Sequence, residues 1–246
     1  MIADCRRWRR CQGALLNGEQ CLENAVGHGK RFLTLFCAAI LVAASGAVCV
    51  QGAEKPGPPK GFVPIFDGKT FRGWEGNFKA FRIEDGAIVA GTLKGPIPRN
   101  EYLCTTQSYT NFELRLKFKV LGKGANAGVQ FRSERVPKSN EMIGYQADLG
   151  ETWWGCLYDE RRHKLLTGPP EAQRNKIIRQ NDWNEYVIRA QGRRVRLWIN
   201  GQQTVDYTEP DGSIPQVGVF GLQVHQGGPM EAWYKDLVLR ELPEHE

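Results

Sequence analysis

Polar side chains recur at alternate positions in four segments whose other residues are largely apolar. The segments are 126–132, 144–148, 153–162 and 221–225. The side chains that we take from them as candidate site residues are Asn126, Gln130, Arg132, Gln146, Asp148, Trp154, Tyr158, Glu160, Arg162, Gln223 and His225. Residues two apart lie on the same face of a strand, so each segment that forms a strand should present its polar residues together.

These residue types suit a carbohydrate ligand. Arginine, glutamine and aspartate form paired hydrogen bonds that match sugar hydroxyls. Aromatic rings, which the 153–162 segment supplies, can cover the apolar face of a sugar ring. We therefore expect a carbohydrate partner, bound on a concave sheet face that the polar residues of these segments line together, with Asn126, Gln130 and Arg132 beside Gln146, Asp148, Gln223 and His225.

Each candidate also has a purely structural interpretation. The polar residues of 126–132 could form an exposed strand face, and Asp148 could cap a turn. A histidine inside a strand, such as His225, is often a hydrogen-bonded structural residue. Trp153 and Trp154 could equally pack in the core or at a sheet edge.

Familiar catalytic motifs are missing from the sequence. It contains no Gly-x-Ser-x-Gly, His-Glu-x-x-His, P-loop or dinucleotide-binding pattern. The Glu-x-Asp-x-x-Glu pattern of retaining sandwich-fold endoglucanases is absent too, and residues 141–151 offer no two carboxylates on one strand face. A glycosidase that uses two carboxylates is therefore weakly supported.

Short alternating runs separated by turn residues supply the elements that must position these side chains. Residues 112–120 alternate strictly between apolar and charged side chains, which predicts a strand with one buried face. Residues 78–83 and 87–90 flank an Asp-Gly turn and predict a hairpin. Further strands are expected at 183–190, 195–199, 217–225 and 232–240, with an Asn-Gly turn at 200–201. Ten or more such strands without helices between them predict an antiparallel β-sandwich, with a closed barrel as the alternative.

An apolar stretch near the N-terminus divides the chain. Residues 32–50 are uncharged and follow Lys30-Arg31, which is typical of a secretory signal peptide; an uncleaved membrane anchor is the alternative. We predict a leader with a signal peptide at 1–53, a Pro/Gly-rich tether at 54–61, one domain at 62–242 and a tail at 243–246. The protein is expected to be exported, to the periplasm or the extracellular space, with no membrane contact beyond the export signal.

The charge and the cysteines belong largely to the leader. Removing the six basic and three acidic residues of 1–53 from totals of 33 and 27 lowers the net charge from +6 to +3. A nucleic-acid partner is therefore not expected. Of seven cysteines only Cys104 and Cys156 remain, so a cysteine-based zinc site is excluded and a single disulfide stays open.

Several segments resemble one family when they are taken together. They are FVPIFDGKTFRGW (62–74), NAGVQFR (126–132), WNEY (183–186), WING (198–201), GLQVH (221–225) and WYKDL (233–237). This combination resembles the 3-keto-disaccharide hydrolase family, also called DUF1080 and described as 3-keto-glucoside lyase/hydratase-like, in a planctomycete-type subgroup. The resemblance implies a concanavalin-like jelly-roll sandwich of two antiparallel sheets, which is exported and acts on glycosides oxidised to a ketone at C3.

The chemistry that the resemblance implies is an elimination. A C3 ketone acidifies the C2 proton, and the enolate formed by its removal expels the C1 substituent before water adds. Carried onto this sequence, His225 would be the base or a metal ligand, Arg132 the oxyanion partner and Asp148 a second acid/base or ligand. Gln130 or Gln223 would orient the substrate. A divalent metal ion could replace Arg132 as the electrophile, although no ligand spacing establishes one.

One strand departs from the family pattern. The usual Glu and Gln of that strand are here Gln146 and Asp148, in that order. Two further interpretations therefore stand beside the enzyme. One is a non-catalytic carbohydrate-binding module on the same fold, and the other is a structural envelope protein whose cleft is filled by Trp153 and Trp154.

Overall fold

The computed structural model describes residues 57–244. The predicted leader and the first residues of the tether lie outside the described residues. The described part contains fifteen strands and one four-residue helix. In chain order they are β1 (Val63–Pro64), β2 (Trp74–Glu75), β3 (Phe81–Glu84), β4 (Ala87–Thr92), β5 (Glu101–Thr105), β6 (Phe112–Leu121), β7 (Asn126–Arg135), β8 (Met142–Gly150), β9 (Leu157–Glu160), β10 (Lys164–Thr167), α1 (Glu171–Arg174), β11 (Asn184–Gln191), β12 (Arg194–Ile199), β13 (Gln202–Thr208), β14 (Val219–Val224) and β15 (Met230–Glu241).

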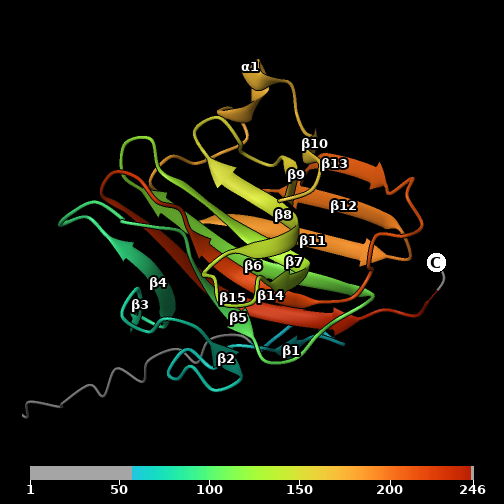
Figure 1. Ribbon diagram of the computed structural model, residues 1–246, viewed down its shortest axis with the longest axis horizontal. Coiled ribbons are helices and arrows are strands. Elements are labelled where there is room, and N and C mark those ends of the chain that lie inside the picture. Colours follow the sequence, from blue (N-terminus) through green and yellow to red (C-terminus); the bar gives the residue numbers. More distant parts are fainter. Residues whose placement is uncertain (1–56, 245–246) are drawn as a thin grey trace, which may run out of the picture. The chain divides into compact units, whose positions relative to one another are not determined.

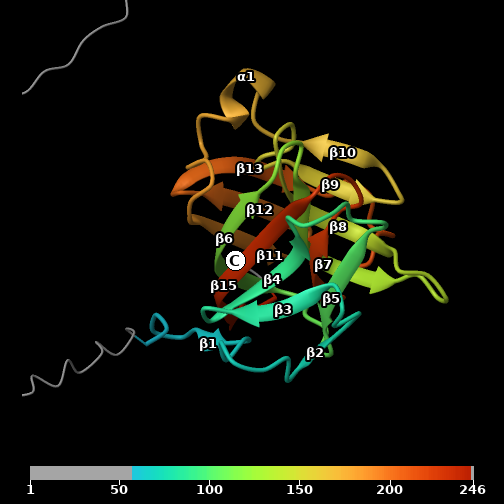
Figure 2. The same ribbon diagram turned by 90° about the vertical axis from the view of Figure 1, so that its left-hand side faces the viewer.

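The strands form two antiparallel sheets. One has the order β13-β12-β11-β6-β15-β4-β3, with β1 paired to β15, and the other has the order β10-β9-β8-β7-β14-β5-β2. Both views show α1 at one end of the domain and β1 with β2 at the other (Figures 1 and 2). The predicted all-β jelly-roll sandwich is confirmed, and no closed barrel forms among the described strands.

The strict alternation of 112–120 produces the central strand β6. Its apolar residues Phe112, Leu114, Leu116, Phe118 and Val120 are all buried in the core between the sheets. The opposite face is charged, as expected. It nevertheless contains one buried residue, Glu113, because Arg115 and Arg240 pair with its carboxylate at 2.6 and 3.0 Å.

The two predicted tight turns also form. Asp85 and Gly86 have φ values of 50° and 71°, and Asn200 and Gly201 have 50° and 79°. Positive φ at both central residues matches the twist of the flanking strands. These turns join β3 to β4 and β12 to β13.

The cysteines do not form the disulfide that the sequence left open. Cys104 and Cys156 are free and buried. Burial raises the pKa of Cys104 to about 12 and that of Cys156 to about 11, so neither thiol is ionised at neutral pH. In the part of the chain described, no helix is long and apolar enough to cross a membrane.

Candidate functional site

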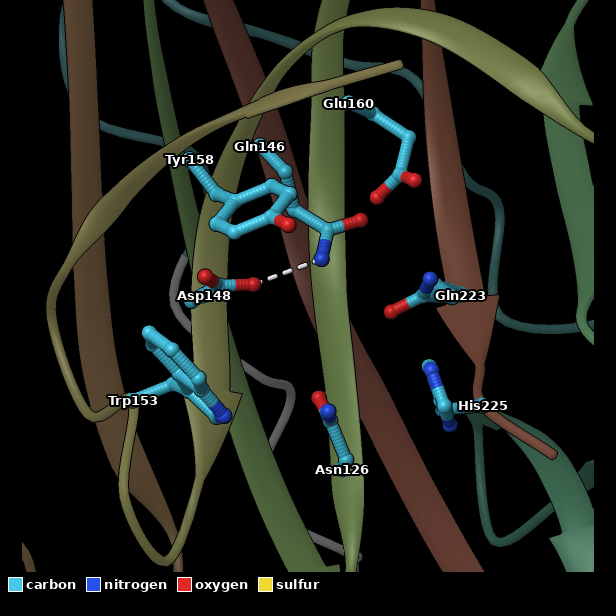
Figure 3. A pocket seen from close by; sticks show the side chains of 8 residues that line it. All are labelled: Asn126, Gln146, Asp148, Trp153, Tyr158, Glu160, Gln223 and His225. Carbon is cyan, nitrogen blue, oxygen red and sulfur yellow. Dashed lines mark hydrogen bonds between the residues drawn. The ribbon is translucent and has the colours of Figure 1, made fainter. Parts of the chain in front are cut away.

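A pocket of about 210 Å³ opens on the outer face of the seven-stranded sheet. On β8, Gln146 and Asp148 alternate with Tyr145, Ala147 and Leu149 of the core, so the two polar residues face away from the core. The pocket is lined by Asn126, Gln146, Asp148, Trp153, Tyr158, Glu160, Gln223 and His225 (Figure 3). The four adjacent strands β9, β8, β7 and β14 or their ends therefore build one site.

A glycine at the centre of the sheet makes room for the pocket floor. Gly128 on β7 lies opposite Asp148 on β8 and Gln223 on β14. A Cβ atom at Gly128 would lie 2.5 Å from the Gln146 side chain. The missing side chain lets Gln146 lie across β7.

Asp148 is held by a hydrogen bond and is almost completely shielded from water. Gln146 Nε2 donates to Asp148 Oδ1 at 2.6 Å, and Gln130 Nε2 donates to Gln146 Oε1 at 2.8 Å. Burial raises the pKa of Asp148 to about 8, against the lowering effect of the Gln146 hydrogen bond. Asp148 is therefore a protonated acid at neutral pH, which is the form that can donate a proton.

Glu160 supplies the second carboxylate of the pocket. Burial raises its pKa, nearby Glu141 raises it further, and His225 lowers it. It lies on β9, whereas Asp148 lies on β8. The sequence search for a carboxylate pair within 141–151 missed this arrangement, because two neighbouring strands contribute one carboxylate each.

His225 directly follows β14 and is held in one tautomer. Its ring Nδ1 lies 2.7 Å from the carbonyl oxygen of Gln226. A carbonyl oxygen can only accept, so Nδ1 carries a hydrogen, and in the neutral ring the lone pair is therefore on Nε2. The backbone N–H of His225 donates to the Asn126 carbonyl at 3.1 Å. This geometry leaves Nε2 able to act as a base.

Two amide oxygens of the pocket are buried without a hydrogen-bond partner among the described residues. They are Asn126 Oδ1 and Gln223 Oε1. Gln223 is only 1 % exposed, and its Nε2 donates to the Tyr102 hydroxyl at 2.8 Å, which directs its oxygen into the pocket (Figure 3). Unsatisfied buried acceptors are costly. Both oxygens are therefore pocket acceptors that still lack a donor among the described residues.

Aromatic side chains form the wall on the β8–β9 side. Trp153 and Tyr158 contact each other edge to face, with ring centroids 6.0 Å apart and an interplanar angle of 78°. Arg174 of α1 braces the turn that carries Trp153: its Nη1 donates to the Thr152 carbonyl and its Nε to the Pro169 carbonyl at 3.0 Å. The wall is thus held from outside the sheet.

The structure separates three predicted site residues from the pocket. Trp154 is buried in the core and stacks on Phe118 with centroids 6.2 Å apart, so the pocket tryptophan is its neighbour Trp153. Arg162 pairs with the buried carboxylate of Asp159 at 2.6 Å. The pocket remains an open cavity, which does not support the interpretation of a cleft filled by both tryptophans.

Arg132 is the third, and a β-bulge explains why. The register of β7 against β8 shifts between Phe131 and Glu134, and Arg132 has a φ of 48°. The alternation that places Asn126 and Gln130 on one face therefore ends before Arg132. Its guanidinium donates to four acceptors, which are the Thr110 carbonyl, the Gly192 carbonyl, Gln216 Oε1 and Asn111 Oδ1.

The remaining predicted residues come together or lie just beneath the pocket. Asn126, Gln146, Asp148, Tyr158, Glu160, Gln223 and His225 line it. Gln130 is fully buried and reaches the pocket through its bond to Gln146. The roles that the sequence assigned to these residues stay predictions.

A metal centre is not evident from the donor set. Across residues 57–244, no group of three or more His, Cys, Asp or Glu side chains is placed to hold a metal ion. The pocket offers two carboxylates and one imidazole, from Asp148, Glu160 and His225. These three side chains are not arranged as one ligand set, and the chemistry proposed for the pocket depends on no metal ion.

Comparison with known proteins places the domain in a family. Residues 61–240 match the family model of the 3-keto-alpha-glucoside-1,2-lyase-like domain. A curated protein of Bacteroides thetaiotaomicron named 3-keto-disaccharide hydrolase is 33 % identical over 100 residues, which cover 37 % of this chain and 34 % of that protein. The alignment thus spans about a third of the relative's length.

Solved structures share the fold at low sequence identity. One from Parabacteroides distasonis, described as a candidate glycosyl hydrolase, has a TM-score of 0.57 and 20 % identity, covering 74 % of this chain and 99 % of that one. The carbohydrate-binding module CBM66 from Bacillus subtilis has a TM-score of 0.51 and 14 % identity, covering 69 % and 96 %. At these identities the likenesses show only that the chains share the β-sandwich fold.

Proposed function

The chain belongs to the family of 3-keto-alpha-glucoside-1,2-lyase-like domains, and we propose that it is an exported enzyme that cleaves glycosides carrying a ketone at C3. Family membership, the 3-keto-disaccharide hydrolase relative and the sugar-sized polar pocket support a carbohydrate substrate. The single observation that carries an enzymatic role is the meeting of a base, His225, with a buried neutral acid, Asp148, in that pocket.

The proposed reaction begins with loss of the C2 proton. The C3 carbonyl accepts the electron pair of the C2–H bond as an enolate, and His225 Nε2 takes the proton. Collapse of the enolate forms the C1–C2 double bond and breaks the C1–O bond, so the electron pair leaves with the aglycon oxygen. A proton from Asp148 neutralises that oxygen. Water can then add to the enone, its oxygen to C1 and a proton to C2, which gives net hydrolysis.

The second carboxylate gives the pocket an alternative base. Glu160 has a raised pKa and lies near enough to His225 for the two charges to interact. It can accept the C2 proton or stabilise the imidazolium that forms on His225. The enolate oxygen can be met by the side-chain amide of Asn126, which lines the pocket, since Arg132 lies elsewhere.

Aglycon release tests the proposal. Purified protein is incubated with a 3-keto-glucoside that carries a chromogenic aglycon, with and without divalent metal ions. We expect release from the 3-keto-glucoside and none from the matched glucoside with an unoxidised C3 hydroxyl. No release under any condition, or equal release from both glycosides, would contradict the proposed chemistry.

A non-catalytic carbohydrate-binding module is the second candidate function. The observation in its favour is the pair of unpartnered acceptors beside an aromatic wall, which would bind a sugar without any turnover. In that case His225→Ala would leave glycan affinity largely intact, whereas Trp153→Ala would weaken it. Binding measured by calorimetry together with an absence of aglycon release would support this function.

Export remains part of the proposal. The uncharged run at 32–50 behind Lys30-Arg31 and the family resemblance in its planctomycete-type form support it. Fractionation of producing cells should recover the protein, shortened by its leader, from the periplasm or the medium. Recovery of the full-length chain from the cytoplasm would contradict export.

A further inference from the structure

We propose that Ser133, Gln130 and Gln146 form a positioning relay that holds Asp148 with Oδ2 as its proton-donating oxygen. The inference rests on the proposed function in so far as that proton reaches a substrate. The hydrogen-bonded chain itself belongs to the protein and can be tested without one. Its members come from β7 and β8, directly beneath the pocket.

The hydrogen bonds of the relay have a single direction. Ser133 Oγ lies 2.7 Å from Gln130 Oε1, 2.9 Å from the Phe131 carbonyl oxygen and 3.3 Å from the Tyr145 carbonyl oxygen, and its one proton goes to the nearest of these acceptors, Gln130 Oε1. Gln130 Nε2 then donates to Gln146 Oε1 at 2.8 Å, and Gln146 Nε2 donates to Asp148 Oδ1 at 2.6 Å. Reversing one amide alone would face nitrogen with nitrogen or oxygen with oxygen, so the two glutamines share one direction. The opposite direction for both would need Asp148 Oδ1 to donate to Gln146 Oε1, whereas in the structure Gln146 Nε2 faces Asp148 Oδ1 and donates to it.

The surrounding backbone is shaped to admit these side chains. The bulge between Phe131 and Glu134 sets Ser133 beside Gln130. A Cβ atom at Gly144 would lie 2.2 Å from Ser133 Oγ, and one at Gly128 would lie 2.5 Å from the Gln146 side chain. Two glycines and a bulge therefore serve the same chain of hydrogen bonds.

Water does not compete for the relay. Gln130, Ser133 and Gln146 are 0 %, 2 % and 3 % exposed. Hydrogen bonds in such surroundings are stronger than at the surface and costly to leave unmade. A rotation of Gln146 away from Asp148 would leave two or more buried polar atoms unpaired, so the carboxyl is held in one orientation.

The relay decides which oxygen of Asp148 carries the proton. Oδ1 already accepts the Gln146 N–H, so a proton on the carboxyl belongs on Oδ2, which accepts no hydrogen bond from residues 57–244. Asp148 lines the pocket beside Tyr158 and Trp153 (Figure 3). The acid is thus presented to the ligand in one geometry, as proton transfer requires.

Two apolar substitutions of similar length test the relay. Gln146→Met removes the donor to Asp148, and Gln130→Met removes the donor that fixes Gln146. We expect each to lower kcat about tenfold through misplacement of the acid, with little change in KM. Both should raise the pKa of the Asp148 carboxyl, because the hydrogen bond favours the ionised form; carbon-13 NMR of aspartate-labelled protein measures that titration.

The double variant separates a relay from general damage. If the residues act in series, Gln130→Met/Gln146→Met should be no worse than Gln146→Met alone in kcat and in the Asp148 titration. Thr105→Val is the matched control: Thr105 is a buried residue of β5 that accepts from the Phe220 N–H at 3.1 Å, outside the relay. It should leave the Asp148 titration unchanged and add independently to either glutamine variant.

Distinct outcomes overturn the relay and the proposed function. An Asp148 titration in Gln130→Met identical to that of the wild type, or additive effects in the double variant, would overturn the relay. The titration of Asp148 needs no substrate. If the titration shifts in the variants but the protein releases no aglycon, the relay is supported and the proposed function is contradicted. Ser133→Ala, which removes only a hydroxyl, should shift the titration less and in the same direction, and serves if Gln130→Met does not fold.

Discussion

Two regions of β7 bury polar side chains in different ways. At its first residues, around Asn126 and Gln130, the strand borders a pocket that contains unpartnered amide oxygens and a protonated carboxyl. Within the bulge, Arg132 is 2 % exposed, and all three of its guanidinium nitrogens donate to carbonyl or amide oxygens. The region around Asn126 has hydrogen-bonding groups left for a ligand. At Arg132 the donors are all used in contacts that connect loops of the fold.

This contrast separates structural from functional polar residues more sharply than residue type does. Arginine is a better anion partner than an amide in general, yet here every guanidinium nitrogen of Arg132 donates a hydrogen bond, whereas Asn126 Oδ1 accepts none from the described residues. Burial lowers the pKa of Arg132 to about 10, so it stays charged at neutral pH and its hydrogen bonds remain charge-assisted.

His225→Ala should have the largest effect of these variants. It should lower kcat and leave the stability of the fold almost unchanged. Loss of the general base lowers kcat about a thousandfold, within the range of general acid–base catalysis. The free energy of unfolding should change little, because the side chain makes a single hydrogen bond to a carbonyl next to it in sequence. His163→Ala, at a histidine paired with Asp159 outside the pocket, is the control and should leave kcat unchanged.

Arg132→Met should show the opposite pattern. It leaves several buried acceptors without donors and should lower the free energy of unfolding by about 3 kcal/mol, measured by denaturant titration. The kcat of the molecules that remain folded should not change. Arg194→Met, at an exposed arginine paired with Asp206 at 2.7 Å, should alter stability little. A loss of kcat in Arg132→Met without loss of stability would place Arg132 in the chemistry after all.

Asp148 should make stability depend on pH. The unfolded chain releases this proton near the ordinary value of 3.8, whereas the folded protein holds it up to about 8. Because the folded state binds the extra proton, stability falls as pH rises across this window, by up to about 1.4 kcal/mol per pH unit from this group. Asp148→Asn should remove that slope, as followed by unfolding free energies from pH 5 to 8. An unchanged slope would mean that Asp148 is ionised in the folded protein.

Arg174→Ala should have the smallest effect. It removes the donor to the Thr152 carbonyl beside Trp153, so the aromatic wall should loosen and KM should rise about threefold. The value of kcat should change less than KM, because no reacting group moves and only the lowering effect of the Arg174 charge on the pKa of Asp148 is lost. Arg179→Ala, at an exposed arginine of the same connection, is the matched control. A fall in kcat rather than a rise in KM would show that α1 reaches the chemistry.

Periodicity predicted the parts of this molecule that are regular. The alternation at 112–120 located β6 and its buried face, and the Asp-Gly and Asn-Gly turns located two hairpins. Within a strand the same reasoning placed Gln146 with Asp148, and Gln223 with His225. These inferences succeed because side chains alternate strictly wherever the ladder is unbroken.

Irregular backbone and contacts between strands lay beyond that reasoning. The bulge after Phe131 reverses the expected face of Arg132. The residue types do not predict this bulge, because the position with positive φ is an arginine rather than a glycine. Trp153 and Trp154 are told apart only by a tight turn. The meeting of Asp148 with Glu160 depends on which strands are neighbours, which the sequence of one chain does not specify. A glycine inside an apolar strand, such as Gly128, was the one available signal of close approach.

A kinetic isotope effect at C2 tests the central claim most directly. The 3-keto-glucoside is prepared with deuterium in place of the C2 hydrogen, and aglycon release is compared with that from the unlabelled substrate under kcat/KM conditions. Proton abstraction by His225 predicts clearly slower release from the deuterated substrate and loss of the deuterium to water. Equal rates, with the deuterium retained in the sugar product, would show that the bond to the aglycon breaks without removal of the C2 proton.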